Sequence, residues 1–240
     1  MNPLQFLIRK RKSPVISRNK NVVYTIIIGN YDDLREPEIV SQDFDYVCLT
    51  DRSDLISQTW KFIKVRCDKK KPPKRCAARL ITYPFDYLKD YELSVRINGN
   101  MSICCDISDF VSRTLPPDKS IAIMRNPKSD CVYIAAQNVI NAKKDEPEVV
   151  LRQMDKYRRE GYPEHNGLLS SQVLIRRHND ENLRKHCRLW LREIDRHSQR
   201  DQLSFNYILW KYKLIDPVYF SPEIREKEFI LHRHNYRQTF

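Results

Sequence analysis

The chain has 240 residues, of which 41% are hydrophobic and 10% aromatic, enough for one large folded domain and too apolar for wholesale disorder. Its four glycines match neither the G-x-G-x-x-G dinucleotide fingerprint nor the G-x-x-x-x-G-K-[ST] phosphate loop. The net charge of +12 favours an anionic partner without selecting one. A phosphate site in this chain must therefore rely on side chains, a metal or a helix N-terminus.

The first twenty residues form a basic segment. Residues 1–20 hold six Lys and Arg and no Asp or Glu, and we predict a flexible tail before a single domain over 21–240. The apolar patch at residues 4–8 precedes the basic run at 9–12, which is the wrong order for a signal peptide, and the patch is too short to cross a bilayer. We therefore expect a cytoplasmic protein. Peripheral contact of the tail with anionic lipid at the inner membrane surface is the alternative to a plain leader.

Strands and helices alternate in the first half of the chain. Residues 22–28 are an uninterrupted, largely β-branched run that predicts a central strand of a parallel sheet, and a polar turn follows it. Asp106 is predicted to cap a helix over 107–114. The other predicted elements are strands at 46–49, 60–65 (near an edge), 93–97 and 120–124, and a helix at 76–82.

Helices dominate the second half. Asp130 and Asp180 are each predicted to cap an amphipathic helix, and another helix follows Pro147. A strand is predicted at 172–176 and a last helix at 203–212. The order of elements predicts an α/β fold, with a mixed, mostly parallel sheet flanked by helices and a further lobe on the acceptor side.

The cysteines indicate no metal or disulfide framework. There are seven, an odd number without C-x-x-C spacing, and we expect reduced, mostly buried thiols. The six histidines do not interleave with them at zinc-ligand spacing, so we expect no zinc site.

Two polar segments at the edges of apolar elements point to a site. Asn98-Gly99-Asn100 ends the strand predicted at 93–97, and Arg200-Asp201-Gln202 precedes a predicted helix. Oxygen-rich clusters at strand ends are where α/β proteins hold a metal or a phosphorylated ligand. Each segment also has a plainer interpretation. The first can be an ordinary turn, and Asp201 can be the N-cap of the helix that follows.

Five short segments resemble a known family and occur in its order. They are Gly29-Asn30-Tyr31-Asp32, Cys48-Leu49-Thr50-Asp51, Ile97-Asn98-Gly99-Asn100, Gly161-Tyr162-Pro163 with Gly167-Leu168, and Arg200-Asp201-Gln202-Leu203-Ser204-Phe205. The family is the glycosyltransferase-like group that joins plant mucilage and pectin-related Golgi proteins with bacterial and viral polysaccharide proteins. Its fold is understood as GT-A-like, a Rossmann-type nucleotide-binding sheet fused to an acceptor lobe.

The resemblance implies a nucleotide-sugar donor, such as a UDP-sugar, and a glycan or polysaccharide acceptor. Asn30, Tyr31 and Asp51 would hold the nucleobase and ribose. Arg75 and Arg79 would face the diphosphate. The implied donor-binding residues are Gly29, Asn30, Tyr31, Asp32, Thr50, Asp51, Arg75, Arg79, Asn98, Gly99, Asn100, Arg200 and Gln202.

The resemblance also implies a divalent cation, Mn²⁺ or Mg²⁺, against the diphosphate. Asn98 and Asn100 occupy the place of the Asp-x-Asp-like motif, and His232 or His234 matches a late metal ligand. The family's usual segment is Asp-Gly-Asn, and a neutral amide is a poorer ligand for a hard cation than a carboxylate.

The family also commonly has His where Asn126 stands and Glu near Ala135. A metal-dependent enzyme, a metal-independent one that neutralises the diphosphate with Arg and Lys, and an inactive relative all stay open.

Sugar transfer with inversion needs a carboxylate that takes the acceptor's proton. Asp201 is the candidate, and Glu193 is the second. In a retaining reaction Asp201 would position the substrate instead.

The competing hypothesis of a nucleic-acid-binding protein rests on charge alone. Outside the tail the basic residues are scattered and no recognition motif occurs, so we expect no nucleic-acid partner.

Overall fold

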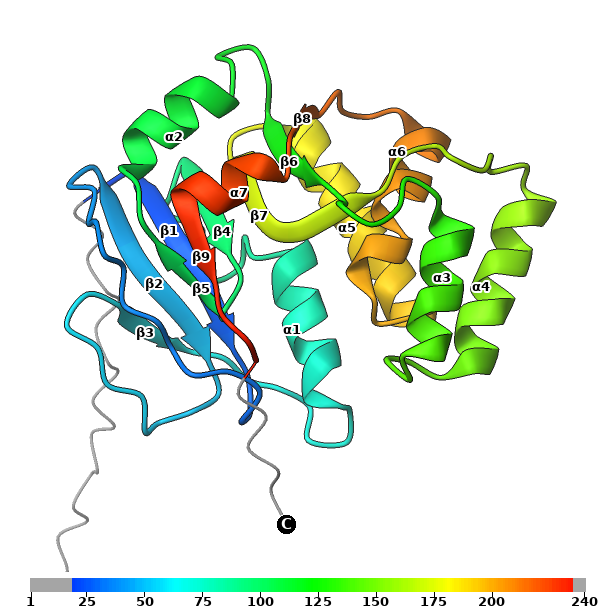
Figure 1. The fold of residues 1–240 in the computed structure, drawn as a ribbon, viewed down its shortest axis with the longest axis horizontal. Coiled ribbons are helices and arrows are strands. Elements are labelled where there is room, and N and C mark those ends of the chain that lie inside the picture. Colours follow the sequence, from blue (N-terminus) through cyan, green and yellow to red (C-terminus); the bar gives the residue numbers. More distant parts are fainter. Residues whose placement is uncertain (1–18, 235–240) are drawn as a thin grey trace, which may run out of the picture.

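The computed structural model of the protein describes residues 19–234 (Figure 1). The predicted basic tail lies outside the described residues, except for its last two. Asn19 Nδ2 donates to the carbonyl oxygen of Gln42 at 3.1 Å, and Lys20 Nζ pairs with Glu92 Oε1 at 2.7 Å. The folded body therefore includes two residues that we assigned to the tail.

A seven-stranded sheet forms the centre of the described structure, in the order β3-β2-β1-β4-β7-β6-β8. Four of its six strand pairings are parallel, and β7 runs antiparallel to both neighbours. This confirms the predicted mixed, mostly parallel sheet, with β3 at the predicted edge. The strands are β1 (Asn21–Ile27), β2 (Phe44–Thr50), β3 (Lys61–Lys64), β4 (Leu93–Ile97), β6 (Ile121–Arg125), β7 (Leu169–Arg177) and β8 (Val218–Phe220).

Helices flank this sheet and also build a lobe beside it (Figure 1). They are α1 (Pro73–Thr82), α2 (Ile107–Thr114), α3 (Val132–Asn141), α4 (Pro147–Arg159), α5 (Glu181–Arg196), a 3-10 helix (Asp201–Leu203), α6 (Phe205–Tyr212) and α7 (Glu223–Glu228). Helices α3, α4 and α6 share a core of their own, in which the rings of Tyr157 and Tyr207 stack with centroids 3.7 Å apart. The predicted lobe is therefore present.

Two of the three predicted Asp caps are confirmed. Asp106 accepts from two backbone N–H groups of α2, and Asp180 accepts from Leu183 N at 2.6 Å. The prediction for Asp130 is wrong, because Cys131 is the N-cap of α3 and makes no side-chain cap. Asp130 Oδ1 instead lies 2.7 Å from His165 Nδ1, so its carboxylate binds a residue distant in sequence rather than the start of α3.

A second, two-stranded sheet ties the end of the described chain to the middle of the sequence. Its strands are β5 (Met101–Ile103) and β9 (Phe229–Leu231), which pair antiparallel. β5 directly follows the Asn98-Gly99-Asn100 turn, and His232 N donates to the carbonyl oxygen of Asn100 at 2.8 Å. The C-terminal strand thus fixes this turn from one side (Figure 1).

The expectation of uniformly reduced cysteines is wrong. Cys67 and Cys76 form a disulfide that closes the basic loop at residues 68–75 onto α1. The two cysteines are nine positions apart, a spacing that resembles no motif, so only the fold brings them together. Cys48, Cys105, Cys131 and Cys187 are free and buried, as predicted, and Cys104 is half-buried. Within residues 19–234 no helix combines the length and apolarity that crossing a bilayer requires.

Candidate functional site

A cleft of about 1780 Å³ opens at the carboxyl ends of β1 and β4. Because β7 is antiparallel to β4, its amino end, residues 170–172, reaches the same edge. The start of α1, the connection from α3 to α4 and the segment 199–202 complete the walls. This is the edge at which open α/β sheets place their ligands.

The Asn98-Gly99-Asn100 turn packs tightly against β1 at the floor of this cleft. A Cβ on Gly99 would lie 2.7 Å from Ile27 Cδ1 and 3.2 Å from the carbonyl oxygen of Ile26, so a larger residue here would require the Ile27 side chain and the turn to shift. Asn98 and Asp201 line the same cleft, as their predicted common site requires.

The side-chain amides of Asn98 and Asn100 form hydrogen bonds with each other and with the segment after β9. Asn98 Nδ2 donates to Asn100 Oδ1, and Asn100 Nδ2 donates to the carbonyl oxygen of His232, both at 2.6 Å. His232 Nε2 lies 2.9 Å from Ser102 Oγ. Asn100 and His232 do not line the cleft. Their role in the described structure is to hold the turn in place.

Arg96 brings a buried positive charge to the wall of the cleft. Its Nη2 donates to Asn98 Oδ1 at 2.9 Å, whereas Nε and Nη1 are buried without a partner among the described residues. Burial lowers the pKa of Arg96 to about 10, despite the opposing charges of Tyr24 and Asp201. Our sequence analysis missed this residue, although an arginine inside the apolar strand Leu93–Ile97 is a detectable signal.

Asp201 brings a buried carboxylate to the cleft. It begins the 3-10 helix, and its backbone oxygen accepts from Trp190 Nε1 at 2.9 Å. The N-cap of α6 is Ser204, so the capping interpretation of Asp201 is wrong. Asp201 is 7% exposed, and its Oδ2 has no hydrogen-bond partner among the described residues. Arg200 and Gln202 line the cleft beside it, and Arg200 Nε is likewise buried and unpaired.

An aromatic and charged group forms another part of the lining. The rings of Tyr31 and His234 have centroids 4.8 Å apart, and Lys74 Nζ lies 5.5 Å from the centre of the Tyr31 ring. His234 Nδ1 contacts Asp32 Oδ1 at 2.8 Å. Burial raises the pKa of Asp32, although the hydrogen bond to His234 opposes that shift. Asn30, Tyr31 and Asp32 line the cleft, as their predicted donor-binding role requires, and Lys74 and His234 line it beside them.

Gly29, Thr50 and Asp51 lie behind the lining. Asp51 Oδ1 accepts from the backbone N–H of Gly29 at 2.9 Å, and Gly29 has a φ of +61° that favours glycine. Thr50 Oγ1 accepts from Arg52 N at 3.0 Å. Asp51 and Gly29 thus shape the turn after β1, Thr50 shapes the turn after β2, and none of the three lines the cleft.

The two arginines predicted to face a diphosphate are engaged elsewhere. Arg75 lines the cleft, but its guanidinium donates to the carbonyl oxygens of Ile194 and His197. Arg79 forms an ion pair with Asp195 and does not line the cleft. Both residues join α1 to α5, because their long side chains reach the end of that helix.

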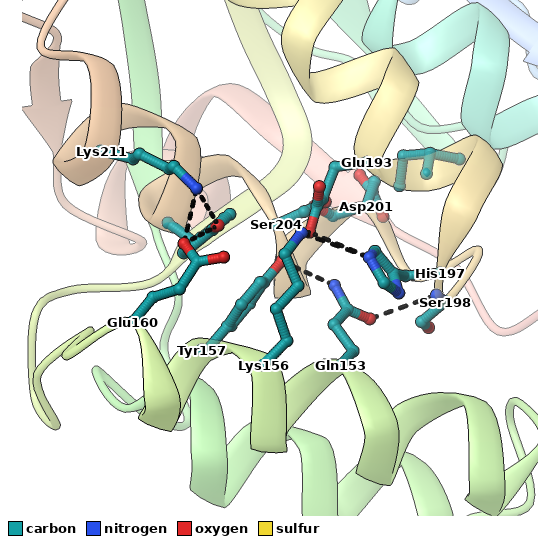
Figure 2. A network of polar contacts seen from close by, with 12 residues as sticks. Gln153, Lys156, Tyr157, Glu160, Glu193, His197, Ser198, Asp201, Ser204 and Lys211 are labelled. Atoms are coloured by element: carbon teal, nitrogen blue, oxygen red, sulfur yellow. Dashed lines mark hydrogen bonds and ion pairs between the residues drawn. The ribbon is translucent and has the colours of Figure 1, made fainter.

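Glu193 lies outside the cleft, in a polar network between α4 and α5 (Figure 2). Its Oε1 accepts from Lys156 Nζ at 2.7 Å and lies 3.5 Å from His197 Nε2. The carboxylate is thus used in holding the two helices together. We therefore withdraw Glu193 as the second catalytic candidate.

Asp145, in the connection from α3 to α4, fixes the backbone that leads to Asp201. Its Oδ2 accepts from Ser198 Oγ at 2.6 Å and from Gln199 N at 2.9 Å. Ser198 Oγ in turn accepts from Arg200 N at 3.1 Å. No pattern in the sequence identifies this role, because the contacts span more than fifty residues.

The residues present do not fit a bound divalent cation. Within residues 19–234 no three His, Cys, Asp or Glu side chains come together as a ligand set. The oxygen of Asn98 already accepts from a guanidinium, whose positive charge opposes a second cation beside it. His232 is held by Ser102, and His234 pairs with Asp32 and packs against the Tyr31 ring.

Comparison with known proteins agrees with the sequence resemblance. The family model described as "TOD1/MUCI70, glycosyltransferase-like domain" matches residues 60–234. No curated protein matches the chain.

Two solved structures resemble the fold. The mannosyltransferase Ktr4p from S. cerevisiae is 10% identical with a TM-score of 0.44, over 82% of this chain and 67% of that one. The same enzyme in complex with GDP is 10% identical with a TM-score of 0.47, over 84% and 69%.

Proposed function

This chain belongs to the TOD1/MUCI70 glycosyltransferase-like family, and from that premise we propose that it transfers a sugar from a nucleotide-sugar to a glycan or polysaccharide-precursor acceptor in the cleft. The observation that carries the proposal is the unpaired carboxylate of Asp201, buried in a cleft that also holds unpaired arginine nitrogens. Buried polar atoms in proteins are nearly always hydrogen-bonded, so such a group requires an explanation. A substrate that supplies the missing partners is that explanation.

The lining supports a particular placement of the donor. The nucleobase lies against Tyr31, whose ring offers a stacking surface, and polar atoms of Asn30 and Asp32 are beside it. The diphosphate lies toward Asn98 and the sugar toward Asp201. The acceptor enters along the connection from α3 to α4, which forms the opposite wall.

The reaction that fits this arrangement is a direct displacement. The bond between the sugar's anomeric carbon and the diphosphate oxygen breaks, and its electron pair stays on the leaving diphosphate. An acceptor hydroxyl oxygen forms the new bond to that carbon, and its proton passes to the Asp201 carboxylate. Positive charge near the diphosphate stabilises the charge that develops on the leaving group.

Replacement of one atom in the Asp201 side chain tests the proposal. Asp201→Asn keeps the shape of the side chain and removes the base, so we expect nucleoside-diphosphate release to fall by about 10²–10⁴-fold. The assay is release from a panel of nucleotide-sugars offered with mixed oligosaccharide acceptors. Asp118→Asn, on an exposed turn, is the matched control and should keep the wild-type rate. Full turnover by Asp201→Asn would remove this carboxylate from the mechanism.

One observation favours a second candidate, a relative that binds a nucleotide-sugar or glycan without turnover. Asn98, Asn126 and Ala135 line the cleft at positions where the family commonly carries acidic or histidine side chains. The same assay distinguishes the two. Donor binding by the wild-type protein without release of nucleoside diphosphate from any donor is the result that selects the binding protein.

A further inference from the structure

Arg96 is a buried charge without a full complement of partners. It is 3% exposed, and two of its three guanidinium nitrogens have no hydrogen-bond partner among the described residues. Asp201 acts on it electrostatically but forms no ion pair with it. Burying an ionised group without a partner is costly, so binding of an anion beside the Arg96 guanidinium would stabilise the folded protein.

A second buried arginine shows what a purely structural guanidinium looks like in the same fold. Arg176 on β7 donates to Tyr24 Oη and to the carbonyl oxygen of Ile81, both at 2.8 Å. It is fully buried and does not line the cleft. Arg176 leaves only its Nε unpaired among the described residues, whereas Arg96 leaves two nitrogens unpaired, has one partner, the Asn98 amide, and lines the cleft. This difference indicates that Arg96 binds a ligand in the cleft, whereas Arg176 stabilises the fold.

The neighbours of Arg96 define the ligand it faces. Asn98, Arg200 and Asp201 line the same cleft, and the arginines have three unpaired buried nitrogens between them. Several N–H donors and two positive charges suit a group with several anionic oxygens, whereas the single Asp201 carboxylate suits a proton-bearing hydroxyl. The charge therefore matches the diphosphate of the donor.

We propose that Arg96, held by the amide of Asn98, supplies the fixed positive charge that binds the donor's diphosphate, so that nucleotide binding in this protein needs no divalent cation. The inference rests on the proposed function and deepens it. The neutral residue at position 98 then has a reason: an aspartate there would pair with Arg96 and cancel the charge that the diphosphate needs. Asn98, which stands where the family has aspartate, thus holds the guanidinium of Arg96 without neutralising its charge.

The test compares nucleotide binding with and without a cation. UDP, GDP, ADP and CDP are titrated into wild-type protein in excess EDTA and again in excess Mn²⁺, with the dissociation constant from calorimetry and the thermal shift as a second readout. We expect the best nucleotide to bind equally well in both, within about twofold. Arg96→Gln keeps an amide beside Asn98 and removes the charge, and should bind at least about tenfold more weakly in EDTA.

Two further variants keep the outcome decisive. Arg113→Gln removes an exposed guanidinium on α2 and is the matched control, expected to bind as wild type. If Arg96→Gln does not fold, Asn98→Asp decides: weaker binding in EDTA supports the proposal, and unchanged or tighter binding overturns it.

The outcomes separate this inference from the function it rests on. Binding by the wild type that requires Mn²⁺, or unchanged binding by folded Arg96→Gln, overturns the role of Arg96 and leaves a nucleotide-dependent transferase standing. Absence of binding by any nucleotide, with and without Mn²⁺, removes the proposed function and this inference together.

Discussion

At the scale of single residues, the buried polar groups of this protein fall into two kinds. In the first kind, such as Arg96 and Asp201, the unpaired atoms belong to residues that line the cleft. His186 has two unpaired ring nitrogens but lies in the core on α5, edge-on to Phe205. The unpaired groups of the cleft residues bind substrate in the proposed reaction, whereas the unpaired nitrogens of His186 lower the stability of the folded protein.

His186 makes folding sensitive to acid. Burial, with Arg176 adding to it, lowers the pKa of His186 to about 3, from an ordinary value of 6.5. Between these two pH values the unfolded chain carries a proton on this ring that the folded chain does not, so stability falls as the pH falls. The slope is about 1.4 kcal/mol per pH unit.

His186→Leu should therefore flatten the dependence of stability on pH. Leucine fills a similar volume with no titrating group. Urea unfolding at pH 7 and pH 5 should show that wild type loses about 2 kcal/mol more than the variant over this interval. His178, whose pKa burial lowers to about 4, is present in both proteins and cancels in the comparison. Equal losses would mean that the ring of His186 is protonated or solvated in the folded protein.

At the scale of elements, the segment 197–201 depends on its neighbours for its position. It follows α5, carries Arg200 and Asp201 to the cleft, and has no regular structure before the 3-10 helix that starts at Asp201. Asp145 holds it from the α3–α4 connection, and Gln153 Oε1 on α4 accepts from Ser198 N at 3.2 Å (Figure 2). The lobe therefore contributes to the position of the catalytic candidate.

Asp145→Ala should loosen this segment without unfolding the protein. The Asp145 carboxylate accepts four hydrogen bonds, two of them from Ser198 Oγ and Gln199 N, and their loss should cost about 1–3 kcal/mol in stability. We expect faster hydrogen exchange at the amides of residues 199 and 200, and a lower kcat with little change in KM for the donor. Wild-type exchange at those amides in a folded variant would show that the segment holds its place unaided. Asp155→Asn, exposed on α4, is the control.

The elements also show which features a sequence can predict. The caps at Asp106 and Asp180 followed from local spacing and were confirmed. Asp130 was mispredicted because His165, 35 residues away, competes for its carboxylate. The Cys67–Cys76 disulfide was missed for a similar reason, since its pairing depends on how the loop folds back onto α1.

At the scale of the whole molecule, the sheet order explains why the site was only partly predictable. The central strands and the Asn98 and Asp201 segments were identified from their patterns, and the fold brings them to one cleft. The engagement of Arg75 with the end of α5 and of Asn100 with His232 spans more than a hundred residues. Such contacts decide which polar side chains remain available to a ligand, and no local pattern records them.

The central claim is that one cleft holds a nucleoside diphosphate within reach of Asp201. A crystal structure of the protein with the nucleoside diphosphate that stabilises it most would test this directly. We predict the diphosphate beside Arg96 and Asn98, the base against the Tyr31 ring, and open space in front of the Asp201 carboxylate for the sugar and acceptor. A nucleotide bound elsewhere on the surface, or one in the cleft with its diphosphate turned away from both Arg96 and Asp201, would contradict the account.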